Sequence, residues 1–335
     1  MNELLIGALG VLLATNQPAA LSNFVAKSTG ISVKIPDPND PVEKDYLRLL
    51  QEDNTAQTEV DSWIKSNEKF AEKGGGVEEA AFRARIRQRM DKIKDRYDAF
   101  LRLHPDHARA RLAYGSFLMD TLAEEEGRVQ WEKARELDPT NPAAWNNLAN
   151  YYGHNSPVAK SFEYYAKAIE LDPNESVYYH NFATTLYLFR PDATNFFKIS
   201  ENEVYDKAMA LYHKALQLDP ANFILAQDVA QSYYGIRLTP SADPAANAKA
   251  QAAITEKALA AWQYALKLAG DDIERQGVYL HLARVQIRAA NFPEAHRHLA
   301  AVTLPIYEVT KATLLRKMEK ATLERKQPAQ PVPPR

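Results

Sequence analysis

The chain has 335 residues, of which 46% are hydrophobic and 25% charged, and its formal net charge is −2. These proportions are those of an ordinary folded protein with a large core, and they argue against a chain that is disordered throughout. The near-neutral charge provides no overall field that would draw the protein to nucleic acid or to an anionic membrane. Because the sequence has no cysteine, disulfides, thiolate metal sites and cysteine nucleophiles are excluded.

The amino-terminal segment, residues 1 to 30, contains an apolar run from residue 4 to residue 14. This run has the length of a signal-peptide core and is too short for a transmembrane span, which takes about 20 residues. No Lys or Arg precedes it, and no clean small-residue cleavage pattern follows it. These departures favour a helix that docks on the protein itself or on a second copy, and a cytoplasmic location. Export of the protein is the alternative.

Residues 31 to 76 are expected to combine a linker with an amino-terminal helix. The linker is placed at residues 31 to 44, which are rich in Pro and Asp, and a flexible break at the three glycines 74 to 76. The helix is expected between residues 57 and 73. From Val77 to Leu103 the pattern predicts one long helix. Its apolar stripe consists of Phe82, Ile86, Met90, Ile93, Tyr97 and Phe100.

Three prolines, Pro105, Pro139 and Pro173, lie 34 residues apart, and the stretches between them have the pattern of two amphipathic helices. The first helix of a stretch carries a small residue, and the second carries a large aromatic one. The small residues are Ala149, Ala183, Ala230 and Ala283, and the aromatic residues are Trp131, Tyr165, Tyr212 and Trp262. We expect the small residues to let paired helices approach closely and the aromatic rings to fill the wedge beside the next pair. The Asp-Pro step is expected to end the second helix.

A 34-residue unit with these features resembles the tetratricopeptide repeat. The most complete copy spans residues 142 to 173, with Trp145, Leu148, Ala149 and Tyr152 in its first helix and Tyr165, Ala168 and Pro173 in its second. Five repeats can be placed within residues 77 to 304, and a sixth is partial. The resemblance implies an all-α, right-handed superhelical solenoid of helix-turn-helix repeats. It further implies a non-catalytic scaffold or adaptor that binds a protein or an extended peptide.

In the resembling family, side chains of the first helices line a concave groove that holds extended peptides. The matching residues here are Asn146, Asn147, Asn150, His154, His180, Asn181, Thr184, Tyr187, Gln227, Asp228, Gln231 and Tyr234. The resemblance therefore implies a polar, nearly uncharged groove. Ile224 and Asp228 stand where chaperone-cofactor members have cations, which argues against a carboxylate clamp.

Asn147 and Asn181 occupy the same position one repeat apart. An Asn amide can accept a hydrogen bond from a peptide N–H and donate one to a peptide C=O, so a row of them would bind backbone rather than particular side chains. The alternative is that Asn is simply tolerated on a hydrated helix face.

Two insertions interrupt the 34-residue period, at residues 191 to 203 and 238 to 251. Both fall between the first and second helices of consecutive repeats, so we expect loops on one edge of the solenoid. Phe196 and Phe197 are the candidates for a partner contact on that edge, and the alternative is that they pack against their own repeat.

Residues 305 to 326 predict a capping helix, with Ile306, Val309, Leu314 and Met318 on or near one side. Residues 327 to 335 form a Pro-rich tail.

No motif of a phosphate loop, a zinc protease, a serine hydrolase or a dinucleotide-binding fold occurs in the sequence. The basic run at residues 83 to 96 is read as a solvated helix face rather than a nucleic-acid site. We therefore expect no catalytic residue, no cofactor and no metal site. The alternatives to an adaptor are self-assembly into a homo-oligomer through the apolar amino-terminal segment, and an accessory subunit of an enzyme complex.

Overall fold

The computed structural model describes residue 37, residues 39 to 236 and residues 242 to 326. Within these residues all regular structure is helical, with fourteen α-helices, α3 to α16, and two short 3₁₀ helices. The chain divides into two compact units, residues 1 to 140 and residues 141 to 335. The apolar segment at residues 4 to 14 and the Pro-rich tail at residues 327 to 335 lie outside the described residues.

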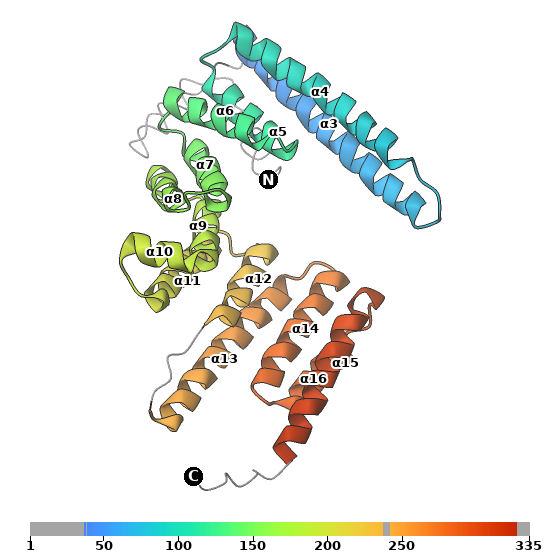
Figure 1. Cartoon of the computed structure of the whole chain (residues 1–335), viewed down its shortest axis with the longest axis vertical. Helices are drawn as coiled ribbons and strands as arrows, with labels where there is room; N and C mark the ends of the chain where they lie inside the picture. The colour runs from blue at the N-terminus through green and yellow to red at the C-terminus, as the bar shows by residue number, and fades with distance from the viewer. Residues whose placement is uncertain (1–36, 38, 237–241, 327–335) are drawn as a thin grey trace. The chain divides into compact units, whose positions relative to one another are not determined.

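The first unit contains two helical pairs, and the helices of its first pair are much longer than those of its second (Figure 1). These helices are α3 (Pro41–Ala71), α4 (Glu79–Leu103), α5 (Ala108–Asp120) and α6 (Glu124–Leu137). The prediction of a linker through residue 44 was wrong, because α3 already begins at Pro41. Proline is compatible with the first turn of a helix, and the Asp40 carboxylate caps the helix by accepting from the Val42 N–H at 2.9 Å.

The core of the first unit lies between α3, α4 and α5. The predicted stripe on α4 is buried at Ile93, Tyr97 and Phe100. The Tyr97 ring stacks on Tyr114 of α5 with 4.9 Å between centroids. Its hydroxyl donates to Oδ2 of the buried Asp53 of α3 at 2.7 Å, and burial raises the pKa of that carboxyl. One aromatic side chain thus links three helices.

The second unit contains four helical pairs and a final helix, α16, which packs against α14 and α15. Its α-helices are α7 (Pro142–His154), α8 (Ala159–Leu171), α9 (Ser176–Leu188), α10 (Arg190–Phe197), α11 (Glu201–Leu218), α12 (Phe223–Ser232), α13 (Pro244–Leu268), α14 (Asp272–Arg288), α15 (Phe292–Ala300) and α16 (Glu308–Lys326). The 3₁₀ helices are η1 (Tyr233–Gly235) and η2 (Pro305–Tyr307). The pairs are α7 with α8, α9 with α11, α12 with α13, and α14 with α15.

The packing expected from the repeat pattern is confirmed. The small first-helix residues Ala149, Ala183, Ala230 and Ala283 are fully buried. The aromatic residues Trp131, Tyr165, Tyr212 and Trp262 are buried as well. Helices α6, α8 and α11 each end at the leucine directly before an Asp-Pro step. Proline therefore ends these helices as predicted.

Most of the described residues in the two insertions are helical, so the prediction of loops was wrong there. In the first insertion, residues 190 to 197 form α10, where Ala193 is fully buried. The Phe196 and Phe197 rings lie 5.4 and 5.6 Å from Phe162 of α8. In the second insertion, α13 begins at Pro244, so residues 244 to 251 lengthen the second helix of their repeat. Each proline lies in the first turn of its helix, where it is tolerated.

The final helix buries Leu314 and Met318 as predicted, whereas Ile306 and Val309 are 71% and 79% exposed. Ile306 lies in η2, outside the helical phase of α16. Val309 is five residues before Leu314 on α16, which places the two side chains about 140° apart around the helix axis. The predicted apolar side was therefore wrong at these two residues.

Gly115 of α5 should be essential to the packing of the first unit. A Cβ atom at this position would lie 2.3 Å from Cδ1 of Trp131, whose indole Nε1–H donates to the Leu112 carbonyl at 3.1 Å. We expect Gly115→Ala to lower the free energy of unfolding by about 1–3 kcal/mol, measured by urea denaturation, because the ring has to move. Gly75→Ala is the control, since its added Cβ would meet nothing nearer than 3.5 Å. Equal stability of the two variants would contradict this packing.

Candidate functional site

The side chains predicted for peptide binding lie on the first helices of successive repeats in the second unit. We call the surface formed by the exposed sides of α7, α9, α12 with η1, and α14 the first-helix face. Side-chain contacts join each of these helices to the next. Asn181 Nδ2 of α9 donates to Asn146 Oδ1 of α7 at 3.1 Å. His180 Nε2 of α9 lies 2.8 Å from Asp228 Oδ2 of α12, so four of the predicted residues form a polar row from α7 to α12.

Among the asparagines of α7, only some are open to a ligand. Asn146 is 5% exposed, and its amide nitrogen lies 3.5 Å from Asn147 Oδ1. Because its oxygen also accepts from Asn181, Asn146 positions its neighbours rather than facing solvent. Asn147 and Asn181 are partly exposed. The two residues predicted to form a ladder are therefore more exposed than Asn146, and each uses one amide atom in a contact with it.

Buried tyrosines of the second helices support the face from behind. The Tyr165 hydroxyl of α8 donates to Asn150 Oδ1 at 2.6 Å. The Tyr212 hydroxyl of α11 lies 2.9 Å from Thr184 Oγ1 of α9. Burial raises the pKa of Tyr165 well above its ordinary value and that of Tyr212 to about 12, so both hydroxyls stay protonated near neutral pH. The same aromatic position in two repeats thus orients a polar side chain on the face.

The other predicted residues differ in exposure. His154 and Gln231 are exposed, and Gln227 is partly exposed. Tyr187 packs against η1, which follows the first helix of the next repeat. A Cβ atom added at Gly235 would lie 2.3 Å from the Tyr187 hydroxyl. The guanidinium of Arg190 lies 4.9 Å from the centre of the Tyr187 ring.

At the α14 end of the face, the structure adds three residues that the sequence reasoning missed, His281, Arg284 and Arg288. The Tyr234 hydroxyl lies 3.2 Å from His281 Nδ1. The guanidinium carbons of Arg284 and Arg288 lie 5.8 and 4.9 Å from the centre of the Tyr234 ring. A signal for Arg284 was present in the sequence, because it follows Ala283 as the predicted groove residues Asn150, Thr184 and Gln231 follow the small residues of their repeats.

The imidazole of His281 is held in a fixed environment. It stacks on the fully buried Trp262 with 4.1 Å between centroids and an interplanar angle of 10°. Burial, together with the positive charge of Arg284, lowers the pKa of His281 to about 4. The ring is therefore neutral near pH 7, and the positive charge at this end comes from the arginines.

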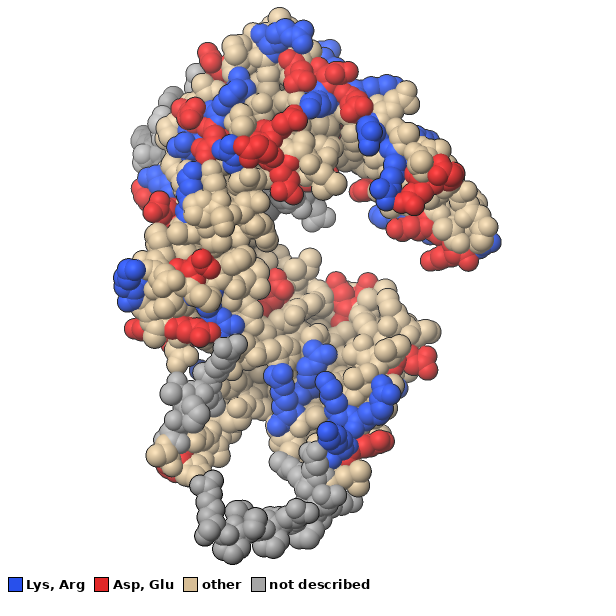
Figure 2. All heavy atoms as spheres, viewed as in Figure 1, with Lys and Arg blue, Asp and Glu red and all other residues tan. Residues whose placement is uncertain are grey.

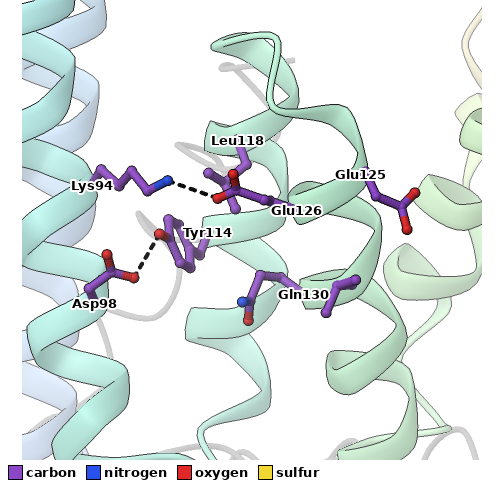
Figure 3. Close-up of a pocket in the computed structure, with 8 residues that line it drawn as sticks. Lys94, Asp98, Tyr114, Leu118, Glu125, Glu126 and Gln130 are labelled. Atoms are coloured by element: carbon purple, nitrogen blue, oxygen red, sulfur yellow. Dashed lines mark hydrogen bonds and ion pairs between the residues drawn. The ribbon is translucent and has the colours of Figure 1, made fainter.

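The first unit has a small pocket of about 350 Å³ between α4, α5 and α6 (Figure 3). Its polar groups pair with one another across the helices. The Tyr114 hydroxyl donates to Asp98 Oδ1 at 2.7 Å, and Lys94 Nζ lies 2.8 Å from Glu126 Oε2. Burial and the Asp98 hydrogen bond raise the pKa of Tyr114 above its ordinary value. These contacts stabilise the packing of the three helices.

The basic run on α4 is largely matched by acidic partners. Arg89 Nε lies 2.6 Å from a Glu59 oxygen, and Arg96 Nε lies 2.9 Å from one of Glu52. Arg83 pairs with Glu79 along the helix. The guanidinium of Arg85 lies 3.9 Å from the centre of the Trp63 ring. These contacts favour the reading of this run as a solvated, ion-paired helix face.

Among the described residues, no cluster of three or more His, Asp or Glu side chains could hold a metal ion. Within residues 39 to 236 and 242 to 326, every helix is too short or too polar to cross a membrane.

A family model for the tetratricopeptide repeat matches residues 142 to 175, which include the pair α7 and α8. Residues 142 to 175 therefore form a tetratricopeptide repeat. Repeats of this family form scaffolds for protein–protein interaction, and the helical pairs described above are of this type. No curated protein sequence is similar enough to match the chain.

Solved structures with a similar fold are distant in sequence. PilW, described as a widely conserved type IV pilus biogenesis factor, aligns with a TM-score of 0.50 and 12% identity over 78% of this chain and 98% of its own. PilF of Pseudomonas aeruginosa aligns with a TM-score of 0.49 and 12% identity over 78% and 99% of the two chains. YrrB, described as a tetratricopeptide repeat protein with an unusual peptide-binding site, aligns with a TM-score of 0.45 and 12% identity over 69% and 98%. At this identity the PilW alignment shows a shared fold alone.

The neutral His281 predicts a pH dependence of the stability of the protein. The folded chain holds the imidazole neutral down to about pH 4, whereas in the unfolded chain it takes up a proton near its ordinary pKa of about 6.5. Lowering the pH from 7 to 5 therefore favours the unfolded state. We expect His281→Gln to lose less free energy of unfolding than wild type over this interval, measured by urea denaturation at both pH values. His154→Gln, which changes an exposed histidine, should keep the wild-type pH dependence. A slope unchanged by His281→Gln would contradict the assignment.

Proposed function

We propose that this protein is a non-catalytic adaptor that binds an extended segment of a partner protein along the first-helix face of its second unit. The observation that supports the proposal is the continuous polar row that joins α7, α9, α12 and α14. An isolated polar residue on each helix would be ordinary surface. A row that crosses four consecutive repeats offers a long track of hydrogen-bonding groups to one extended chain.

The chemistry of this row suits a peptide backbone. An extended peptide rises by about 3.3 Å per residue, and each residue presents one N–H and one C=O group. A side-chain amide can form a hydrogen bond with either group. Asn147 and Asn181 are partly exposed and lie on neighbouring helices, α7 and α9. Their orientation is restrained by Asn146, which contacts both. Restraining these groups before binding reduces the entropy lost when a peptide is captured.

Aromatic side chains beside the row would add apolar contact. Tyr234 presents a ring next to the polar groups of α12 and α14, and its hydroxyl is already engaged with His281. A tyrosine held in this way offers contact area with little conformational entropy to lose. The face therefore combines backbone-directed amides with one fixed aromatic platform.

The test is capture of a partner by crosslinking in the native host, followed by affinity purification. We expect Asn147→Ala with Asn181→Ala to lose most of a partner that wild type captures, because two backbone-directed amides are removed. The double substitution should lower the free energy of unfolding by about 1 kcal/mol, because it removes the hydrogen bond from Asn181 to Asn146. Circular dichroism and thermal unfolding would check this.

The matched control is Asn174→Ala with Asn195→Ala, which removes two exposed amides away from the face. This variant should capture the partner as wild type does. Equal capture by the Asn147 and Asn181 double variant would reject the ladder. Recovery of the chain itself as the only crosslinked species would favour self-assembly over an adaptor.

A further inference from the structure

The α14 end of the first-helix face carries two positive charges that no carboxylate of the described residues neutralises. Within residues 39 to 236 and 242 to 326, neither Arg284 nor Arg288 forms an ion pair with Asp or Glu. Other arginines of the same unit do so. Arg190 pairs with Glu201, Arg275 with Asp272, and Arg297 with Glu294.

The two arginines belong to one face of α14. They are four residues apart, and His281 is three residues before Arg284, so all three side chains project from the same side of the helix. Both guanidiniums approach the Tyr234 ring, at 5.8 and 4.9 Å from its centre. The ring thus gathers the two cations at one place on the face.

This cationic end is supported by rigid packing beneath it. Trp262 is fully buried and stacks against His281, whose Nδ1 is in turn 3.2 Å from the Tyr234 hydroxyl. A chain of contacts from the core therefore fixes the ring over which the arginines lie. A site restrained in this way loses less entropy on binding than two free surface arginines would.

The surrounding surface extends the positive charge. Figure 2 shows Lys and Arg gathered over the part of the second unit where Figure 1 has α14 and α16. From His281 to Arg288 the sequence contains two arginines and no acid. Over residues 308 to 323, α16 has four cations, Lys311, Arg316, Lys317 and Lys320, against two acids, Glu308 and Glu319. By contrast, the α7 and α9 end of the face presents amides and hydroxyls.

We propose that Arg284 and Arg288 bind carboxylate side chains of an acidic segment in the partner, so that the bound segment is acidic at its α14 end and uncharged at its α7 end. This inference rests on the proposed function and specifies the partner it would select. Each planar guanidinium can donate two parallel hydrogen bonds to a carboxylate. The ligands are Asp or Glu side chains within the segment, and a free chain terminus is not required.

An acidic peptide fits this site better than a nucleic acid. Nucleic-acid sites combine many phosphate-binding cations with exposed aromatic rings on which bases stack. Here two cations lie at the Tyr234 ring. In the longer basic run on α4, Arg83, Arg89 and Arg96 are already paired with glutamates.

The test uses the full chain and a rhodamine-labelled octaglutamate that is blocked at both ends, with blocked octaglutamine as the neutral probe. Binding is measured by fluorescence anisotropy. We expect octaglutamate to bind more tightly than octaglutamine, and its affinity to fall as NaCl is raised from about 0.05 to 0.3 M. Arg284→Gln with Arg288→Gln should weaken octaglutamate binding by about tenfold or more, because two charged hydrogen-bond donors are removed.

The matched control is Arg275→Gln with Arg297→Gln, which removes the same net charge from arginines that already have carboxylate partners. It should bind octaglutamate as wild type does. An equal loss in both double variants would overturn the proposal, because it would indicate a general charge effect. Tighter Arg284- and Arg288-dependent binding of a blocked octauridylate than of octaglutamate would also overturn it, in favour of a nucleic acid.

The same variants separate this inference from the proposed function. Partner capture that depends on Asn147 and Asn181 but not on Arg284 and Arg288 would support the adaptor and overturn the acidic segment. Octaglutamate binding that depends on the arginines, with capture independent of the asparagines, would support an acidic-ligand site and overturn the ladder.

Discussion

Close approach of paired helices at one small residue per repeat is the constraint on which the second unit depends. Ala149 and Ala183 are fully buried where the first helix of each pair meets the second. Because the helices approach so closely, the aromatic residue of the second helix, Tyr165 or Tyr212, lies deep in the pair, and its hydroxyl reaches the exposed side of the first helix. The packing of the pair and the arrangement of the face are therefore coupled, since the same tyrosine fills the wedge and orients a polar side chain on the face.

The sequence predicts the repeated part of the fold well because the decisive contacts are local and periodic. A small residue, an aromatic residue and an Asp-Pro step recur in one order, and each has the same physical role in every repeat. The insertions break this regularity, and the loops predicted there are largely helical among the described residues. Pro191 and Pro244 suggest loops, but proline is also common in the first turn of a helix, where both residues lie. Burial of Ala193 against neighbouring helices stabilises α10, and this packing cannot be read from local sequence.

For the candidate site, the sequence predicts polar residues on the first helices. It does not show which of them are buried in hydrogen bonds within the protein and which are exposed to a ligand. Asn146 and Asn147 are adjacent in sequence, yet the first is buried beneath the contact with α9 and the second is partly exposed. The difference depends on how neighbouring repeats pack, which no single repeat encodes. The pairing of His180 with Asp228 joins residues 48 positions apart and depends on the same geometry.

The two ends of the first-helix face differ in charge. The α7 end presents amides, the carboxylate of Asp228 is paired with His180, and Arg284 and Arg288 remain without a carboxylate among the described residues. Like charges four residues apart on a helix destabilise it by about 0.2–0.5 kcal/mol. The Tyr234 ring offsets part of this repulsion, and a bound carboxylate would remove the rest. The affinity of the α14 end for an acidic segment would then include relief of repulsion already present in the free protein, which favours partners of one charge pattern bound in one orientation.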